Sequence, residues 1–221
     1  MKPGAWSFSS LDKFVNCPRQ FHAVKVAKTV VEPETEQMRW GTWMHKQFED
    51  RQKFGRPLPA NIMKHETFML MLLNLPGTFE TEQKVALDRR GMPTTFFAKD
   101  VWWRGIIDYV KIDGTHAYVV DYKTGKPHQK FGQLKLFALY ILARYPKVQT
   151  VKVEFYWTNT MTCTGDVYGR DNSSRLWSEF VPNLKQYMKA FHTNTWQPRP
   201  SGLCNGWCPV TTCEFWKPKR G

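Results

Sequence analysis

The sequence contains no run of about 20 apolar residues, so it predicts no membrane-spanning helix. Residues 1–10 contain no apolar signal core, which argues against export and favours a reducing cytoplasm. There is no internal repeat or low-complexity tract, and no Gly-x4-Gly-Lys-Ser/Thr sequence of the kind that binds nucleotide in helicase motors. These absences favour one domain over residues 1–221, without a motor of its own.

Acidic residues are scarce, since 19 Asp and Glu stand against 32 Lys and Arg and give a net charge of +13. A field of that sign attracts polyanions, so nucleic acid is the leading candidate partner. Charge alone describes an ordinary basic protein equally well. The ten Trp, eight Tyr and fifteen Phe add faces on which unpaired bases can stack, although most of them will fill the core.

The hydrophobic pattern predicts helices first and a sheet afterwards. A first helix should begin at Ser9 or Ser10 as N-cap and be interrupted at Pro18. Further helices are expected at 41–53, 61–75, 128–145 and 173–192, and strands at 82–87, 101–112, 117–122 and 151–158. This order predicts an α/β fold with a mixed central sheet flanked by helices. The catalytic core should cover about 78–195, with segments 7–28 and 198–220 outside it.

Two acidic residues and a lysine fall on the predicted hairpin formed by 101–112 and 117–122. Alternation along a strand points Asp121 and Lys123 to the same face. If Asp113-Gly114 is a two-residue turn, position 108 lies opposite 119, and Asp108 joins that face. The Cα atoms of the two aspartates should then be on the order of 5–8 Å apart, within reach of one metal ion.

Two carboxylates at such a separation repel each other, and Mg²⁺ or Mn²⁺ would relieve the repulsion with oxygen ligands. A cation there can polarise a phosphate and lower the pKa of a bound water, while Lys123 orients the water and neutralises developing charge. A bare Asp-x-Lys is far more often a surface ion pair. The apolar strand, the upstream Asp108 and the basic charge favour the functional interpretation.

These segments resemble the RecB-type branch of the PD-(D/E)XK nucleases. The resemblance rests on four segments spread over nearly the whole chain: Gly105-x-x-Asp108 with Asp121-Tyr-Lys123-Thr-Gly, Ser9-Ser10-Leu11 through Cys17-Pro18-Arg19-Gln20-Phe21, Gly41-Thr-Trp-Met-His45 with Glu49, and Gln133-Leu134. It implies a restriction-endonuclease-like core that hydrolyses phosphodiesters.

The resemblance also implies roles for individual residues. Its metal ligands would be His45, Asp108, Asp121 and the carbonyl of Tyr122. Its catalytic residues would be Asp108, Asp121, Lys123 and Gln133, with Gln133 contacting the lysine or the substrate. The family's tyrosine four residues after the glutamine is Phe137 here, and Tyr140, on nearly the same helix face, could replace it. Glu82 is a weaker candidate acid, for which a solvated strand position is the simpler interpretation.

The cysteines form a second pattern. Cys204, Cys208 and Cys213 cluster in the tail and Cys17 lies far upstream, whereas zinc sites usually pair their ligands in two close knuckles. A 4Fe–4S cluster suits this arrangement better, with zinc the runner-up. The pattern resembles AddB-like nucleases and CRISPR-adaptation exonucleases, in which a cluster joins the N- and C-terminal segments, although the middle cysteine is shifted by one position here. Cys163 has no place in the scheme and is expected to be buried.

The sequence therefore predicts a metal-dependent DNA exonuclease that acts on single-stranded ends and carries a structural 4Fe–4S cluster. By resemblance it would work in the cytoplasm of a prokaryotic cell or a virus-infected host, with helicase, recombination or CRISPR-adaptation proteins as candidate partners. The alternative is a non-catalytic nucleic-acid-binding module with structural zinc, on a nuclease fold that has lost its activity. The presence of Asp108, Asp121 and Lys123 argues against such a loss. An RNA nuclease is also open.

Overall fold

A computed structural model describes residues 3–219 and divides the chain into two compact units. One unit is Thr35–Trp177, and the other combines Met1–Glu34 with Ser178–Gly221. The unit Thr35–Trp177 includes the helix carrying His45 and stops before 178. The catalytic core over about 78–195 stays a prediction, because a compact unit does not define the catalytic part. No helix within the described residues is long and apolar enough to cross a membrane.

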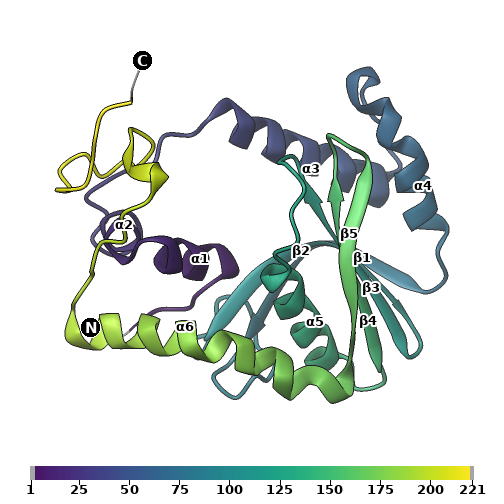
Figure 1. Ribbon diagram of the computed structural model, residues 1–221. Helices are drawn as coiled ribbons and strands as arrows, with labels where there is room; N and C mark the ends of the chain where they lie inside the picture. The colour runs from purple at the N-terminus through teal and green to yellow at the C-terminus, as the bar shows by residue number, and fades with distance from the viewer. Residues whose placement is uncertain (1–2, 220–221) are drawn as a thin grey trace. The chain divides into compact units, whose positions relative to one another are not determined.

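The unit Thr35–Trp177 is built on a five-stranded sheet of order β1-β2-β3-β4-β5 (Figure 1). The strands are β1 (Thr78–Leu87), β2 (Trp103–Asp113), β3 (His116–Lys123), β4 (Thr150–Trp157) and β5 (Thr162–Gly169). Only β3 and β4 run parallel, because α5 (Gly132–Arg144) connects them as a crossover. The prediction of a mixed α/β sheet is confirmed.

Helices cover both faces of this sheet. On one face, α3 (Glu36–Phe54), the 3-10 helix η2 (Ala60–His65) and α4 (Glu66–Asn74) pack their apolar side chains around Tyr109, Tyr122 and Tyr156. On the other face lies α5, whose residues 136–142 are all buried, as expected of a helix that is apolar on all sides. Phe131, just before α5, packs against Phe155, which alternates with Tyr156 along β4.

Several predicted boundaries were wrong. The loop between β2 and β3 is Gly114-Thr115, because Asp113 already pairs with His116. The helix predicted at 128–145 begins only at Gly132, and α3 begins five residues before the predicted Gly41. Strand β5 was missed altogether, because its polar, mostly exposed residues lack the apolar alternation of a buried strand.

The second unit contains α1 (Phe8–Asn16), α2 (Pro18–Phe21), a short π-helix (His22–Val26), the 3-10 helix Gly202–Cys204 and most of α6 (Ser173–Thr193). Helix α1 is capped by Ser7, two residues before the predicted Ser9, with a capping box to Ser10. Pro18 restarts the helix as predicted, at a position where its missing N–H costs nothing. An aromatic cluster forms the core of this unit: Phe14, Phe21, Tyr187, Phe191 and Trp196.

Candidate active site

Strands β2 and β3 bring Asp108 and Asp121 together. Their last paired residues are Tyr109 and Val120, and this register continues to place Asp108 opposite Asp121, not opposite position 119 as predicted. The two registers differ by an even number of residues, so the predicted shared face is unchanged. Gly105 serves packing in this motif, since a Cβ there would lie 3.0 Å from the Phe137 ring.

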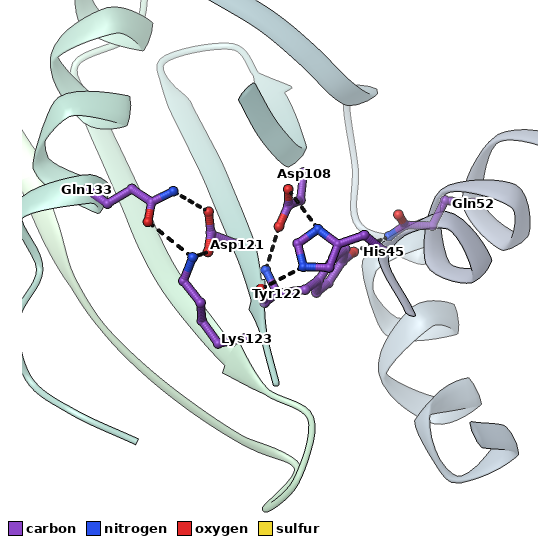
Figure 2. A network of polar contacts seen from close by, with 7 residues as sticks. All are labelled: His45, Gln52, Asp108, Asp121, Tyr122, Lys123 and Gln133. Atoms are coloured by element: carbon purple, nitrogen blue, oxygen red, sulfur yellow. Dashed lines mark hydrogen bonds and ion pairs between the residues drawn. The ribbon is translucent and has the colours of Figure 1, made fainter. Parts of the chain in front are cut away.

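Asp108 belongs to a polar group that joins α3 to the sheet (Figure 2). Its Oδ2 accepts a hydrogen bond from the backbone N–H of Tyr122 at 2.7 Å, and its Oδ1 lies 3.3 Å from His45 Nδ1. His45 Nε2 donates to the Tyr122 carbonyl at 2.9 Å. The three predicted ligand groups His45, Asp108 and the Tyr122 carbonyl therefore lie in direct contact.

Asp121 belongs to a second group on the α5 side, also seen in Figure 2. Gln133 Nε2 donates to Asp121 Oδ1 at 2.8 Å, and Lys123 Nζ donates to Gln133 Oε1 at 3.1 Å. Lys123 also forms an ion pair with Asp121 Oδ2. Gln133 thus holds Lys123 and Asp121 together. Strand alternation could not reveal these contacts, because Gln133 lies on α5.

Glu82 is the residue whose placement sequence reasoning missed. Its carboxylate lies with His45 and Asp108 in a set whose ligand atoms are all within 4.8 Å of one another. The backbone of Glu82 has φ +50°, a left-handed conformation inside β1 that costs about 1–2 kcal/mol for a residue with a side chain. Strain at a non-glycine residue is a known signal of function, but it is visible only in the structure.

The electrostatics of this region reflect crowded carboxylates. Burial, followed by the charge of Asp108, raises the pKa of Glu82 to about 7. Burial also raises the pKa of Asp121, although Lys123 counteracts it. Burial would lower the pKa of His45, but contact with Asp108 outweighs it and raises that pKa to about 9. Carboxylates that resist ionisation together are the kind that a cation stabilises.

An open pocket of about 410 Å³ gives access to this region and is lined by His45, Lys46, Glu49 and Glu82, among others. Lys46 forms ion pairs with Glu49 at 3.0 Å and with Asp50 at 2.9 Å. His45 and Glu49, the two residues of this helix that take part in the family resemblance, therefore both line the pocket.

The structure does not bring Tyr140 into these two groups. Its side chain is buried and packs at a ring distance of 6.5 Å against Trp103. Among residues 3–219, no hydrogen bond or ion pair links Tyr140 to Asp121, Lys123 or Gln133. The replacement of the family's tyrosine by Tyr140 therefore stays a prediction that these contacts do not support.

The cysteines converge separately, within the unit that contains both chain ends. Cys17, Cys204, Cys208 and Cys213 all line one small cavity. Lys217 N–H donates to the Cys204 carbonyl at 2.8 Å, and Trp216 Nε1 donates to the Cys208 carbonyl at 3.1 Å. None of the five cysteines, all within residues 3–219, forms a disulfide, and Cys163 is exposed on β5, so the prediction that it is buried was wrong.

Comparison with known proteins identifies the family of this chain. The PD-(D/E)XK nuclease superfamily model matches residues 5–213. Among solved structures, the "Putative exonuclease" from Eubacterium rectale is 11% identical with a TM-score of 0.53, covering 95% of this chain and 86% of its own. A protein named SSO0001 is 12% identical with a TM-score of 0.46, covering 97% and 88%. No curated protein matches. With nearly its whole length matched, the chain belongs to the PD-(D/E)XK nuclease superfamily.

Proposed function

We propose that this protein is a divalent-cation-dependent DNA exonuclease that hydrolyses phosphodiesters at single-stranded ends. The observation that carries the proposal is that His45, Glu82 and Asp108 gather within one set of ligand atoms, with His45 and Glu82 lining a pocket. Asp121, opposite Asp108 in the strand register, pairs with Lys123. An isolated ion pair explains Asp121 with Lys123, but it does not explain why the other three residues come together.

The donor set fits Mg²⁺ or Mn²⁺. His45, Glu82 and Asp108 offer ligand atoms within 4.8 Å of one another, and the Tyr122 carbonyl is in contact with the same histidine. Carboxylate and carbonyl oxygens are the ligands these cations prefer, and Mn²⁺ also accepts imidazole. When bound, such a cation supplies Lewis-acid polarisation of a phosphate and a water of lowered pKa. Asp121 is the fifth candidate ligand.

The remaining residues position the reacting groups. Gln133 and Asp121 hold Lys123 Nζ, so the position of its ammonium group is set before a substrate binds. In the proposed reaction it orients the attacking water and neutralises charge that develops on the phosphoryl oxygens. Gln133 is a positioning residue, because it acts through the two side chains it holds.

A nucleic acid substrate is favoured by the net charge of +13, and the 33 aromatic residues could support stacking of unpaired bases. DNA is proposed by resemblance to the RecB-type nucleases. RNA hydrolysis and a non-catalytic binding role are the competing proposals. Helicase, recombination or CRISPR-adaptation proteins remain the proposed partners, by resemblance to the nucleases with a similar cysteine pattern.

The decisive experiment incubates purified protein with labelled linear single-stranded DNA, the same sequence circularised, the duplex and an RNA version, at one salt concentration. Cleavage of linear DNA that requires Mg²⁺ or Mn²⁺ and stops with EDTA is expected. Asp121→Ala and Lys123→Ala should each lose at least ~100-fold in rate while still binding DNA. Full activity in either variant would remove this site from consideration, and equal rates on linear and circular DNA would replace the exonuclease by an endonuclease.

We further propose that the four cysteines lining one cavity hold a structural 4Fe–4S cluster. One cysteine far upstream and three in the tail differ from the two close ligand pairs typical of zinc sites. This arrangement favours a multi-iron cluster, whose thiolates bind different iron atoms.

Metal analysis of anaerobically purified protein tests this second proposal. A brown protein with about four irons per chain is expected. One zinc per chain without iron would reject the cluster while keeping a metal at the same cysteines.

A further inference from the structure

A second pocket has a volume of about 670 Å³ and is lined by Thr124, the residue that follows Lys123. It shares no lining residue with the pocket at His45. Helix α3 contributes Trp40 and Trp43 to its wall. Helix η2 contributes Asn61, and the segments that follow β3 and β4 contribute Thr124 and Asn159. All of these residues belong to the unit Thr35–Trp177.

This pocket is fixed to the segment that follows Lys123. Asn159 Nδ2 donates to the Thr124 carbonyl at 2.7 Å, and Thr158 N–H donates to the Lys123 carbonyl at 2.9 Å. Helix α3 approaches the same segment closely, since a Cβ on Gly41 would lie 3.3 Å from Thr124 Oγ1. A ligand in this pocket would therefore lie beside the backbone that carries Lys123.

The two tryptophans have unequal roles. Their rings stack with centroids 4.9 Å apart and planes inclined by 26°. Trp43 packs against the apolar cluster beneath α3, whereas Trp40 is 40% exposed. Trp43 thus supports Trp40 from one side and leaves an indole surface of Trp40 exposed.

We infer that this pocket binds an unstacked nucleobase of the single-stranded substrate, from a nucleotide flanking the bond that is cut. The inference rests on the proposed nuclease function and names a subsite for it. Indole surfaces bind bases of any sequence by stacking, and the side chains of Asn61 and Asn159 offer amide groups to a base edge. Holding one base sets the register of the strand, and so sets which phosphate reaches Lys123.

The binding test needs no cleavage, because EDTA is present throughout. A short single-stranded DNA is compared with copies carrying one abasic site at each position in turn, using wild-type protein and Trp40→Ala. Wild type should bind about 10-fold more weakly when the abasic site falls at one particular position. Trp40→Ala should show that loss for intact DNA and no further loss for the abasic copy, and Trp40→Phe should restore the difference.

Phe54→Ala is the matched control. Phe54 is an exposed aromatic on the same helix, about 21 Å along its axis from Trp40, and should behave as wild type. With Mn²⁺ present, the same abasic position should shift the cut site in wild type and leave it unchanged in Trp40→Ala.

The outcomes separate the two proposals. Absence of cleavage by wild type would overturn the nuclease function, while the binding comparison still decides the subsite. Cleavage combined with equal abasic effects in wild type and Trp40→Ala would overturn the subsite alone. An RNA oligonucleotide bound with the same position-dependent loss and more tightly than DNA would overturn the assignment to DNA.

Discussion

Asp108 and Asp121 stand opposite each other on neighbouring strands, yet their side chains take different partners. Asp108 is held by His45 and by the Tyr122 N–H, whereas Asp121 is held by Lys123 and Gln133. Asp108 therefore lies among the candidate metal ligands, whereas Asp121 is paired with Lys123. Glu82, strained into the left-handed region, completes the first environment.

Glu82→Gln tests that assignment at the residue scale. The amide keeps the size of the side chain but removes a negative ligand, so Mn²⁺ affinity should fall ~10-fold, equivalent to about 1.4 kcal/mol. Titration calorimetry measures the affinity. The melting temperature gives an independent readout, because a bound ion stabilises the fold by mass action.

Glu80→Gln is the control for this change, since Glu80 is exposed on the same strand. Its Mn²⁺ affinity should equal that of wild type. If Glu82→Gln bound Mn²⁺ as tightly as wild type, Glu82 would not be a ligand.

At the scale of elements, the short helix η2 is anchored to β4 through a buried histidine. His65 is 1% exposed, its Nδ1 lies 2.8 Å from the Tyr156 hydroxyl, and its ring packs edge-on against Phe48. Burial, with a smaller effect of Lys64, lowers the pKa of His65 to about 4. The fold therefore favours the neutral imidazole.

This predicts a pH dependence of stability in a defined window. Between pH 6.5 and about 4 the unfolded chain binds a proton at His65 that the folded chain refuses, so the free energy of unfolding falls as the pH falls. The contribution is fully present above the ordinary pKa of 6.5 and its loss is on the order of 3 kcal/mol.

Urea unfolding of wild type and His65→Gln at several pH values measures this loss. The variant should be less stable near neutral pH and should lack this part of the slope. Parallel pH profiles for the two proteins would contradict the prediction.

At the scale of the whole molecule, the N- and C-terminal segments belong to one compact unit. The tail 198–219 contributes few buried apolar side chains to that unit. Hydrogen bonds and an ion pair hold the tail in this unit, including Arg19 with Glu214 and Arg199 Nη1 with the Val15 carbonyl at 2.5 Å. A metal group joining Cys17 to Cys204 would close a loop of nearly the whole chain, worth about 4–5 kcal/mol if it acts like a long cross-link.

Cys17→Ser should therefore lower the melting temperature of the metal-loaded protein markedly. Cys163→Ser is the matched control, because Cys163 is exposed in β5 and lies outside the cysteine-lined cavity. Thermal unfolding followed by circular dichroism measures both. Equal melting temperatures for the two variants would contradict the role of Cys17 as a structural ligand.

The sequence by itself determined the features that depend on local periodicity and chemical type. Strand alternation put Asp121 and Lys123 on one face. The mixed sheet followed from the order of helices and strands, because a parallel pair needs a crossover. These inferences needed no distance between separate elements.

Only the tertiary structure decided which side chains meet across elements. Packing of α3 on the sheet brought His45 to Asp108, and a backbone twist in β1 turned Glu82 toward both. Packing of α5 gave Gln133 to Asp121 and buried Tyr140 against Trp103. The physical reason is that periodicity fixes the direction of a side chain within its own element, whereas contact between elements depends on how their apolar surfaces pack.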